Sequence, residues 1–263
     1  MNKMKEILEK VYNVPELRKS IVPLFIGNPG LGKTVIIEEF AKEKGVNIVE
    51  FITSQRNPFE ISGMAMPDRD AKKMAIWDFD GMLNMKDGDI LFFDEILNGN
   101  PSVLNACLTL IEQRVMISGK KLPDIMIVAA ANPQGMVPIT PQIKERFVWY
   151  RVTYQASMWK EYMRVKFNMP PEICAGLSLL IQVEDFKGDN NYHTPRSVVK
   201  AVNLAIHDVP SPYKASVEIE LSKLVMNILP EPVTLEEGTT MEPNELVPYL
   251  SLLKLNTNGN TTK

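Results

Sequence analysis

A glycine-rich turn followed by a lysine and a threonine is the group of residues best suited to chemistry in this sequence. The apolar run Ile21–Ile26 leads into the turn, which reads GNPGLGKT over residues 27–34. This is the phosphate-binding pattern G-x-x-x-x-G-K-[ST]. Its glycines let the backbone curl until successive N–H groups point inward and hold an anion, and the following helix adds its positive end. The pattern therefore predicts a nucleotide phosphate site.

Two side chains at the end of the turn have separate predicted roles. Lys33 is expected to reach the β- and γ-phosphates, and the Thr34 hydroxyl is expected to hold Mg²⁺. A glycine-rich strand-to-helix turn without a ligand is the alternative. The apolar run before the turn and a good helical pattern over Thr34–Lys44 favour the phosphate site. The residues predicted to contact the nucleotide are Asn28, Pro29, Gly30, Leu31, Gly32, Lys33, Thr34 and Val35.

Two neighbouring carboxylates end a second apolar run. Residues 90–93 (ILFF) precede Asp94 and Glu95. A continuous apolar run suits a strand buried on both faces of a parallel sheet, and such sheets bind ligands at the carboxyl ends of their strands. We expect Asp94 to anchor Mg²⁺ through its water shell and Glu95 to polarise the water that attacks the γ-phosphorus. Alone this is weak evidence, but after a phosphate loop it becomes strong.

A third buried strand, predicted over residues 124–131 (DIMIVAAA), ends at Asn132-Pro133. Asn132 can place its amide near the γ-phosphate or the attacking water. An asparagine that simply turns the chain before proline is the alternative. The position at another parallel strand end favours the functional interpretation.

The elements that must position these residues predict an α/β fold built on a parallel sheet. A further strand is predicted over residues 47–52 and a helix over 101–114, whereas Val11–Ser20 is predicted to be a connector broken at Pro15. Beyond residue 153 the pattern changes to amphipathic helices, predicted over 156–167, 171–183, 195–208 and 215–229. We therefore expect a nucleotide-binding core over 1–153, an all-helical lid over 154–230, and a linker and C-terminal tail over 231–263.

Two hairpins are predicted outside the sheet. Residues 64–66 and 74–79 flank a charged turn and predict a β-hairpin that projects from the domain. Trp77 and Phe79 could grip a partner there, or they could pack the hairpin against the body. A second, smaller hairpin is predicted around residues 115–121.

Composition limits the remaining classes. The 263 residues are 45% hydrophobic and carry a net charge of -3, which argues weakly against nonspecific nucleic-acid binding by the whole surface. Cys107 and Cys174 lie in apolar runs without metal-ligand spacing and are expected to be buried free thiols. His193 and His207 lack neighbouring ligands, so they predict no metal site. No signal peptide or membrane-spanning segment is predicted, and we expect a soluble cytoplasmic protein without membrane insertion.

The order of the motifs resembles the MoxR-like group of AAA+ ATPases. It runs GNPGLGKT, ILFFDE, AANP, a Lys-Glu-Arg-Phe segment and a Thr-Pro-Arg-Ser segment, and the resemblance covers roughly residues 15 to 230. It implies a P-loop AAA+ core with a five-stranded parallel sheet. In one respect the sequence departs from the group, which often has asparagine two residues after the catalytic glutamate. Here Leu97 holds that position and Asn98 follows it.

The resemblance also implies roles for three polar residues. Asn132 would be the first sensor, Arg146 the finger that enters the neighbouring subunit's site, and Arg196 the second sensor on the lid. An arginine finger compensates charge in the transition state. A surface salt bridge is the alternative for Arg146, and Arg151 is a competing candidate for the finger. Thr194 and Pro195 are explained by capping of the helix that follows them.

The function implied is Mg²⁺-dependent ATP hydrolysis by a homo-oligomeric ring, most simply a hexamer, that remodels a protein partner. The group commonly works with a von Willebrand factor A-type protein, and the first hairpin would lie near the ring's pore. A nucleic-acid motor or loader is one alternative, for which Lys72, Lys73, Trp77, Lys120 and Lys121 are available on the hairpins. A nucleotide-gated scaffold with slow turnover is another, and no motif distinguishes ATP from GTP.

Overall fold

The computed structural model describes residues 3–68, 70, 73–77, 80–116, 118–181, 194–207, 209, 233–234 and 240–241. The chain divides into two compact units, Met1–Thr153 and Tyr154–Lys263. Several predicted features lie outside the described residues. They are the helix over 215–229, and Lys72, Phe79 and His193.

A five-stranded parallel sheet forms the first unit, as predicted. Its strands are β1 (Pro23–Ile26), β2 (Ile48–Ile52), β5 (Ile90–Asp94), β6 (Met126–Ala131) and β7 (Val148–Arg151). They lie side by side in the order β2-β5-β6-β1-β7, and every pairing is parallel. The carboxyl ends of β1, β5 and β6 therefore meet at one edge of the sheet, which is the edge that carries the predicted site.

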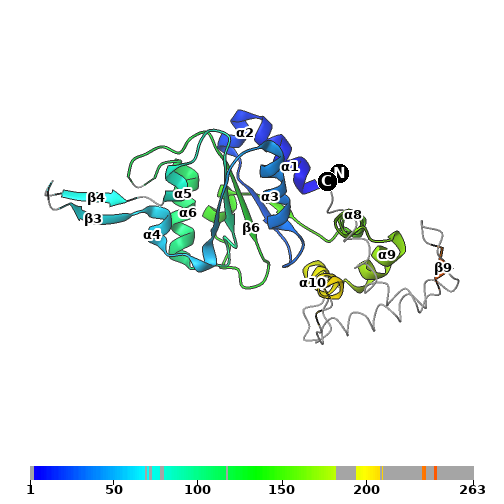
Figure 1. Ribbon diagram of the computed structural model, residues 1–263. Coiled ribbons are helices and arrows are strands. Elements are labelled where there is room, and N and C mark those ends of the chain that lie inside the picture. The colour runs from blue at the N-terminus through cyan, green and yellow to red at the C-terminus, as the bar shows by residue number, and fades with distance from the viewer. Residues whose placement is uncertain are drawn as a thin grey trace. The chain divides into compact units, whose positions relative to one another are not determined.

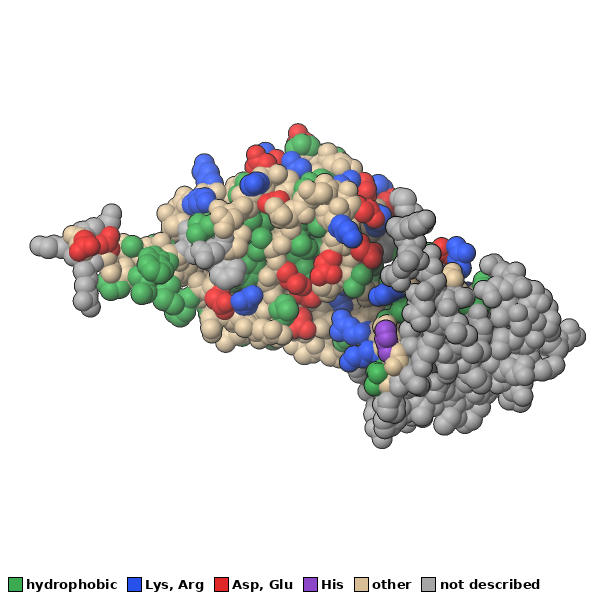
Figure 2. Space-filling model, viewed as in Figure 1, with side chains coloured by type: hydrophobic (Ala, Val, Ile, Leu, Met, Phe, Trp, Pro, Cys, Tyr) green, Lys and Arg blue, Asp and Glu red, His purple; other side chains and the backbone are tan. Residues whose placement is uncertain are grey.

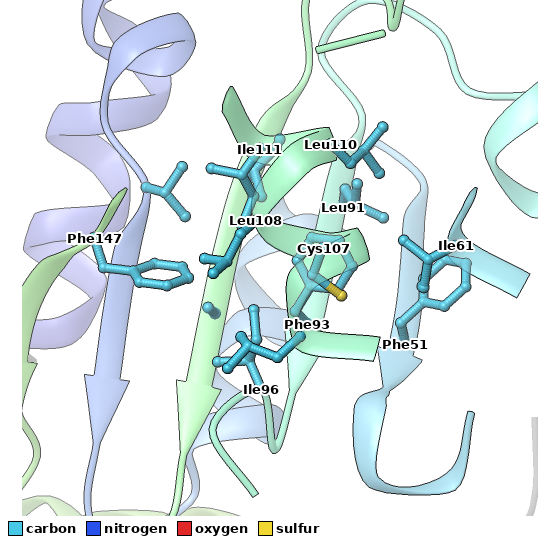
Figure 3. Packing of buried hydrophobic residues seen from close by; sticks show 14 of the residues in the cluster. Phe51, Ile61, Leu91, Phe93, Ile96, Cys107, Leu108, Leu110, Ile111 and Phe147 are labelled. Atoms are coloured by element: carbon cyan, nitrogen blue, oxygen red, sulfur yellow. The ribbon is translucent and has the colours of Figure 1, made fainter. Parts of the chain in front are cut away.

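The central strands are buried on both faces, which explains their continuous apolar sequences. On β5, Leu91 and Phe93 pack into the core of one face, while Ile90 and Phe92 pack into the core of the other. Figure 3 shows Leu91 and Phe93 together with Phe51 of β2 and residues of the covering helices. The four apolar side chains of β5, Ile90 to Phe93, are all 0% exposed, and the polar residue Asp94 appears only where the strand ends.

Helices cover both faces of the sheet (Figure 1). On one side lie α1 (Lys3–Asn13) and α3 (Lys33–Lys44). On the other lie α4 (Pro58–Ser62), α5 (Asp80–Leu83), α6 (Pro101–Gln113) and α7 (Pro141–Arg146). Cys107 of α6 is buried and free, as predicted, and burial raises the pKa of its thiol to about 12.

The predicted connector over Val11–Ser20 was wrong. Helix α1 continues to Asn13, and a second helix, α2, covers Pro15–Ser20. Pro15 stands in the first turn of α2 rather than in a helix interior, and a proline is tolerated there because the first N–H groups of a helix have no partner within it.

The hairpin outside the sheet is present. Strands β3 (Met64–Asp68) and β4 (Lys73–Trp77) pair antiparallel and project from the body in Figure 1. A short 3₁₀ helix, η1 (Thr53–Gln55), joins β2 to this part of the chain. At the second predicted hairpin, Val115 and Lys121 form an isolated antiparallel bridge. Backbone hydrogen bonds flank it, from the Met116 N–H to the Lys120 carbonyl at 2.8 Å and from the Leu122 N–H to the Arg114 carbonyl at 2.9 Å.

The second unit contains α8 (Ala156–Phe167), α9 (Pro171–Leu180) and α10 (Pro195–Ile206). Thr194 caps α10, because its hydroxyl oxygen accepts a hydrogen bond from the Ser197 N–H at 3.0 Å. Within the stretch predicted to be a linker and tail, β8 (Val233–Thr234) and β9 (Thr240–Met241) pair antiparallel, and their β-branched residues favour extended backbone. No described helix has the length and apolar character needed to cross a membrane.

An ion pair joins α2 to the chain just before β6. Arg18 donates to both carboxylate oxygens of Asp124, at 3.2 and 2.7 Å. Arg114, just after α6, donates to the Arg18 carbonyl at 2.8 Å. The hydrogen bond from Arg18 lowers the pKa of Asp124. The pair therefore ties three segments of the core together.

We predict that Asp124→Asn lowers the free energy of unfolding by roughly 1.5–3 kcal/mol at pH 7, the range for a hydrogen bond to a charged group. Because the folded pKa of Asp124 is lowered, the stabilisation is fully present above the unfolded pKa of about 3.9 and is lost as pH falls through the folded value. Urea unfolding between pH 7 and 3 measures this. Glu6→Gln, which breaks an exposed pair with Lys10, is the control. Equal stability of the Asp124 variant and the parent at pH 7 would contradict the prediction.

Candidate nucleotide site

The glycine-rich loop connects β1 to α3. Gly30 and Gly32 have φ of 81° and 83°, in the left-handed region that glycine adopts readily. Gly32 is also the residue from which α3 starts, so Lys33 is the first helical residue. At Gly27 the loop passes so close to the end of β7 that an added Cβ would lie 2.6 Å from the Val152 carbonyl oxygen. The loop thus requires glycine for both its turn and its packing.

The Lys33 side chain is buried beneath the loop. The residue is 7% exposed, and its ammonium donates to the carbonyls of Gly27 at 2.6 Å and Asn28 at 3.1 Å. It also donates to Asn132 Oδ1 at 3.0 Å. Two residues predicted from separate strand ends are therefore in contact, with a lysine cation and an asparagine amide at the same point.

Thr34 contacts the acidic strand end. Its hydroxyl donates to Asp94 Oδ2 at 2.9 Å, although β6 lies between β5 and the loop-bearing strand β1. The other carboxylate oxygen of Asp94 accepts a hydrogen bond from the Glu95 N–H at 2.8 Å. The two residues predicted to hold Mg²⁺ thus lie beside each other.

Glu95 is held by two residues that the sequence did not single out. Its backbone φ of 55° is in the left-handed region, and its carbonyl accepts a hydrogen bond from the Thr53 hydroxyl at 2.7 Å. The Ser54 hydroxyl donates to the Glu95 carboxylate. Both residues belong to η1, which follows β2, the neighbour of β5. The only sequence signal for Thr53 and Ser54 was that two polar residues follow a predicted strand. Assigning them to Glu95 required knowing that β2 lies beside β5.

The three arginines are placed differently. Arg146 ends α7 and forms an ion pair with Glu112 of α6 at 2.5 Å, rather than with a residue of the phosphate loop. The Arg146 side chain is 25% exposed, so part of it faces solvent. Arg151 is exposed at the end of β7, opposite Ile26 of β1. Arg196 is exposed in the first turn of α10, in the second unit.

Negative charge gathers on the β5 side of the site. Burial raises the pKa of Glu50 on β2, and the carboxylates of Asp94 and Glu38 raise it further. A carboxylate whose pKa is raised by neighbouring negative charges, as that of Glu50 is, gains from a nearby cation. This electrostatic environment favours binding of a divalent cation beside Asp94.

The side chains fit Mg²⁺ and a phosphate group. Thr34 and Asp94 offer hard oxygen atoms, the ligands that Mg²⁺ prefers. Among the described residues, no group of three or more His, Cys, Asp or Glu side chains could enclose a metal ion. A metal bound here would therefore take few protein ligands and complete its shell with water and phosphate oxygens, as Mg²⁺ does at nucleotide sites.

The sheet order, the loop and the acidic strand end define the class, a P-loop domain with the AAA+ fold. The solved Thermotoga maritima RuvB Holliday junction branch migration motor matches with a TM-score of 0.54, at 15% sequence identity, over 98% of this chain and 87% of that one. At this identity the likeness shows the fold alone.

Sequence relatives match a smaller share of their own length. The Holliday junction branch migration complex subunit RuvB of Helicobacter hepaticus is 32% identical over 170 residues, which are 64% of this chain and 42% of that protein. The uncharacterized protein MJ0079 of Methanocaldococcus jannaschii is 25% identical over 139 residues, 49% of this chain and 35% of that protein. The chain thus spans less than half the length of both relatives.

The family is narrower than the fold class. A profile described as the MoxR domain in the MoxR-vWA-beta-propeller ternary systems matches residues 17–148. The matched segment contains the phosphate loop, the acidic pair, Asn132 and Arg146. The chain belongs to this MoxR family of AAA+ ATPases, which confirms the resemblance seen in its motifs.

We predict that Ser54→Ala leaves nucleotide affinity unchanged and raises the basal rate of ATP hydrolysis by up to about tenfold. Glu95 would no longer have to leave a hydrogen bond before it contacts water, and about 1.4 kcal/mol corresponds to that factor. Steady-state phosphate release measures the effect. Ser62→Ala removes a hydroxyl that bonds within α4 and is the control. A lower rate for Ser54→Ala than for the parent would show that this hydrogen bond supports turnover.

Proposed function

We propose that the chain binds ATP with Mg²⁺ and hydrolyses it. The observation that carries the proposal is the convergence of Lys33, Asn132, Thr34 and Asp94 through hydrogen bonds of 2.9–3.0 Å. These residues come from the start of α3, which follows the loop after β1, and from the ends of β5 and β6. The choice of ATP over GTP rests on the family.

Each residue has a role that follows from its chemistry. Apart from Pro29, which has no backbone N–H, the loop residues Asn28 to Val35 offer N–H groups to the phosphates, and Lys33 neutralises their charge. Thr34 and Asp94 hold Mg²⁺, whose charge supplies electrostatic stabilisation when it is bound. Glu95 accepts a hydrogen bond from the attacking water and orients it. Asn132, which lies beside Lys33, contacts the reacting phosphate.

We propose further that the chain acts in a homo-oligomeric ring, with a hexamer as the simplest arrangement. Subunits related by rotation meet head to tail, so each can supply a residue to its neighbour's site. Arg146 is the proposed finger, since it is the last residue of α7 and its side chain is 25% exposed. Arg196, at the exposed start of α10, is the proposed second sensor. The helical unit is the proposed lid.

We propose that the chain uses ATP hydrolysis to remodel a protein partner. The described hairpin residues expose large apolar side chains, and Figure 2 shows this patch on the projection. Trp77 is 66% exposed, Met74 60% and Met64 46%. Methionine and tryptophan suit contacts with varied protein surfaces. The family description names vWA and β-propeller proteins in ternary systems, so a vWA-type partner in the cytoplasm is proposed.

A nucleic-acid motor is the second candidate, favoured by the RuvB relatives. The exposed described residues of β3 and β4 are mainly apolar, whereas a nucleic-acid groove needs basic side chains. Stimulation of ATP hydrolysis by DNA, with a salt-dependent affinity, would support this candidate. Stimulation by a vWA protein would support the first. A scaffold with slow turnover is disfavoured by the complete acidic pair.

We predict that Glu95→Gln still binds ATP but hydrolyses it at least about 100-fold more slowly, because general-base catalysis contributes that much or more. Lys33→Ala should lose binding, since it removes the buried cation at the phosphate site. Fluorescent-nucleotide titration and phosphate release separate the two effects. Normal turnover by Glu95→Gln would remove Glu95 from its assigned role.

We predict that Arg146→Ala and Glu95→Gln, each nearly inactive alone, regain activity when mixed in equal amounts. In a mixed ring, an intact Glu95 from one variant meets an intact Arg146 from the other, and an arginine finger is worth about 10³-fold or more. Arg151→Ala, expected to stay active alone, is the matched control. If native mass spectrometry finds mixed rings that remain inactive, Arg146 does not act in the neighbouring site.

A further inference from the structure

Asn98 forms a side-chain clamp between two turns at the nucleotide site. Its amide nitrogen donates to the carbonyls of Asn132 at 3.1 Å and Gln134 at 2.7 Å. Its amide oxygen accepts a hydrogen bond from the Asn132 N–H at 3.0 Å. One side chain of the acidic turn therefore holds both backbone polar groups of Asn132.

Further hydrogen bonds connect the clamp to Glu95 and Lys33. The Asn98 N–H donates to the Glu95 carbonyl at 2.8 Å, which closes the turn that carries the acidic pair. Asn132, on the other side, uses its own side chain to contact Lys33 at 3.0 Å. Glu95, Asn98, Asn132 and Lys33 thus form a continuous chain of hydrogen bonds.

The clamp is more than is needed to fold the two turns. Backbone hydrogen bonds already join them, from Ile96 N–H to the Ala130 carbonyl at 3.0 Å and from Val137 N–H to the Leu97 carbonyl at 2.8 Å. The side chains of Ile96 and Leu97 are 0% exposed, so core packing fixes them independently. The additional bonds of Asn98 are concentrated on the one residue whose side chain contacts Lys33.

We propose that Asn98 is a positioning residue for ATP hydrolysis, which acts by fixing the backbone of Asn132 and hence the amide that faces Lys33. The inference rests on the proposed function. It also gives a reason for an asparagine three residues after Glu95, because the turn with left-handed Glu95 brings the third residue to the Asn132 backbone.

The test is the effect of Asn98→Ala on hydrolysis and on binding. We expect kcat to fall roughly 10- to 100-fold, the cost of misplacing a group by about 1 Å. Affinity for a non-hydrolysable ATP analogue should stay within about threefold, because the phosphate loop is unchanged. Asn98→Asp is a second variant of the same shape. It keeps the acceptor for the Asn132 N–H but lacks the two donated bonds, so its kcat should also fall at least about tenfold.

Asn100→Ala is the matched control. Asn100 lies two residues away, and its side chain caps α6 by accepting a hydrogen bond from the Ser102 N–H at 2.8 Å. Loss of this cap should lower the melting temperature and leave kcat unchanged. A merely structural role for Asn98 predicts the same pattern for Asn98→Ala, and that result would overturn the inference.

A double mutant tests whether Asn98 acts through Asn132. In an Asn132→Ala background, Asn98→Ala should have little further effect on kcat, because the amide that it positions is absent. Multiplied effects of the two substitutions would contradict the inference. Failure of the proposed function is separate, since it would appear as absent hydrolysis by the unmodified chain or as normal turnover by Glu95→Gln.

Discussion

The site depends on placing the Lys33 ammonium in a nearly water-free position at the carboxyl edge of the sheet. An ammonium taken out of water is costly unless polar groups are arranged around it. Here the loop carbonyls and the Asn132 amide oxygen surround it at 2.6–3.1 Å. These hydrogen bonds compensate part of the free energy that the ammonium loses when it leaves water. The loop curvature, the glycines and the end of β6 all serve this one placement.

The strand order explains why residues far apart in sequence meet there. Strand β6 lies between β1 and β5, so Asn132 stands between the phosphate loop and the acidic pair. The backbone hydrogen bonds between neighbouring strands end at this edge of the sheet. Beyond it, side-chain hydrogen bonds connect the segments that follow the strands. Thr34 reaches Asp94, Ser54 reaches Glu95, and Asn98 reaches Asn132. The ends of neighbouring strands are therefore linked by direct polar contacts.

The sequence was sufficient for those parts of the site that are encoded locally. The loop spacing and the apolar run before Asp94 predict their elements because each depends on adjacent residues. Ser54 and Asn98 could not be assigned in this way, since their partners are 41 and 34 residues distant and are defined only by strand order and by the turn at Glu95. The Val11–Ser20 connector was wrong for a local reason, because Pro15 was taken as a break although it begins a helix.

Arg146 is paired with Glu112 in the isolated chain, and this pairing is compatible with a role in another subunit. Glu112 is 55% exposed, and ion pairs involving exposed carboxylates typically contribute only about 0–1 kcal/mol. Release of the guanidinium toward a phosphate of higher charge would therefore meet little resistance. Both partners end helices that pack together, since Glu112 lies in the last turn of α6 and Arg146 ends α7. Because α6 also follows the acidic turn, one helix joins the residue that pairs with Arg146 to the turn that carries Glu95.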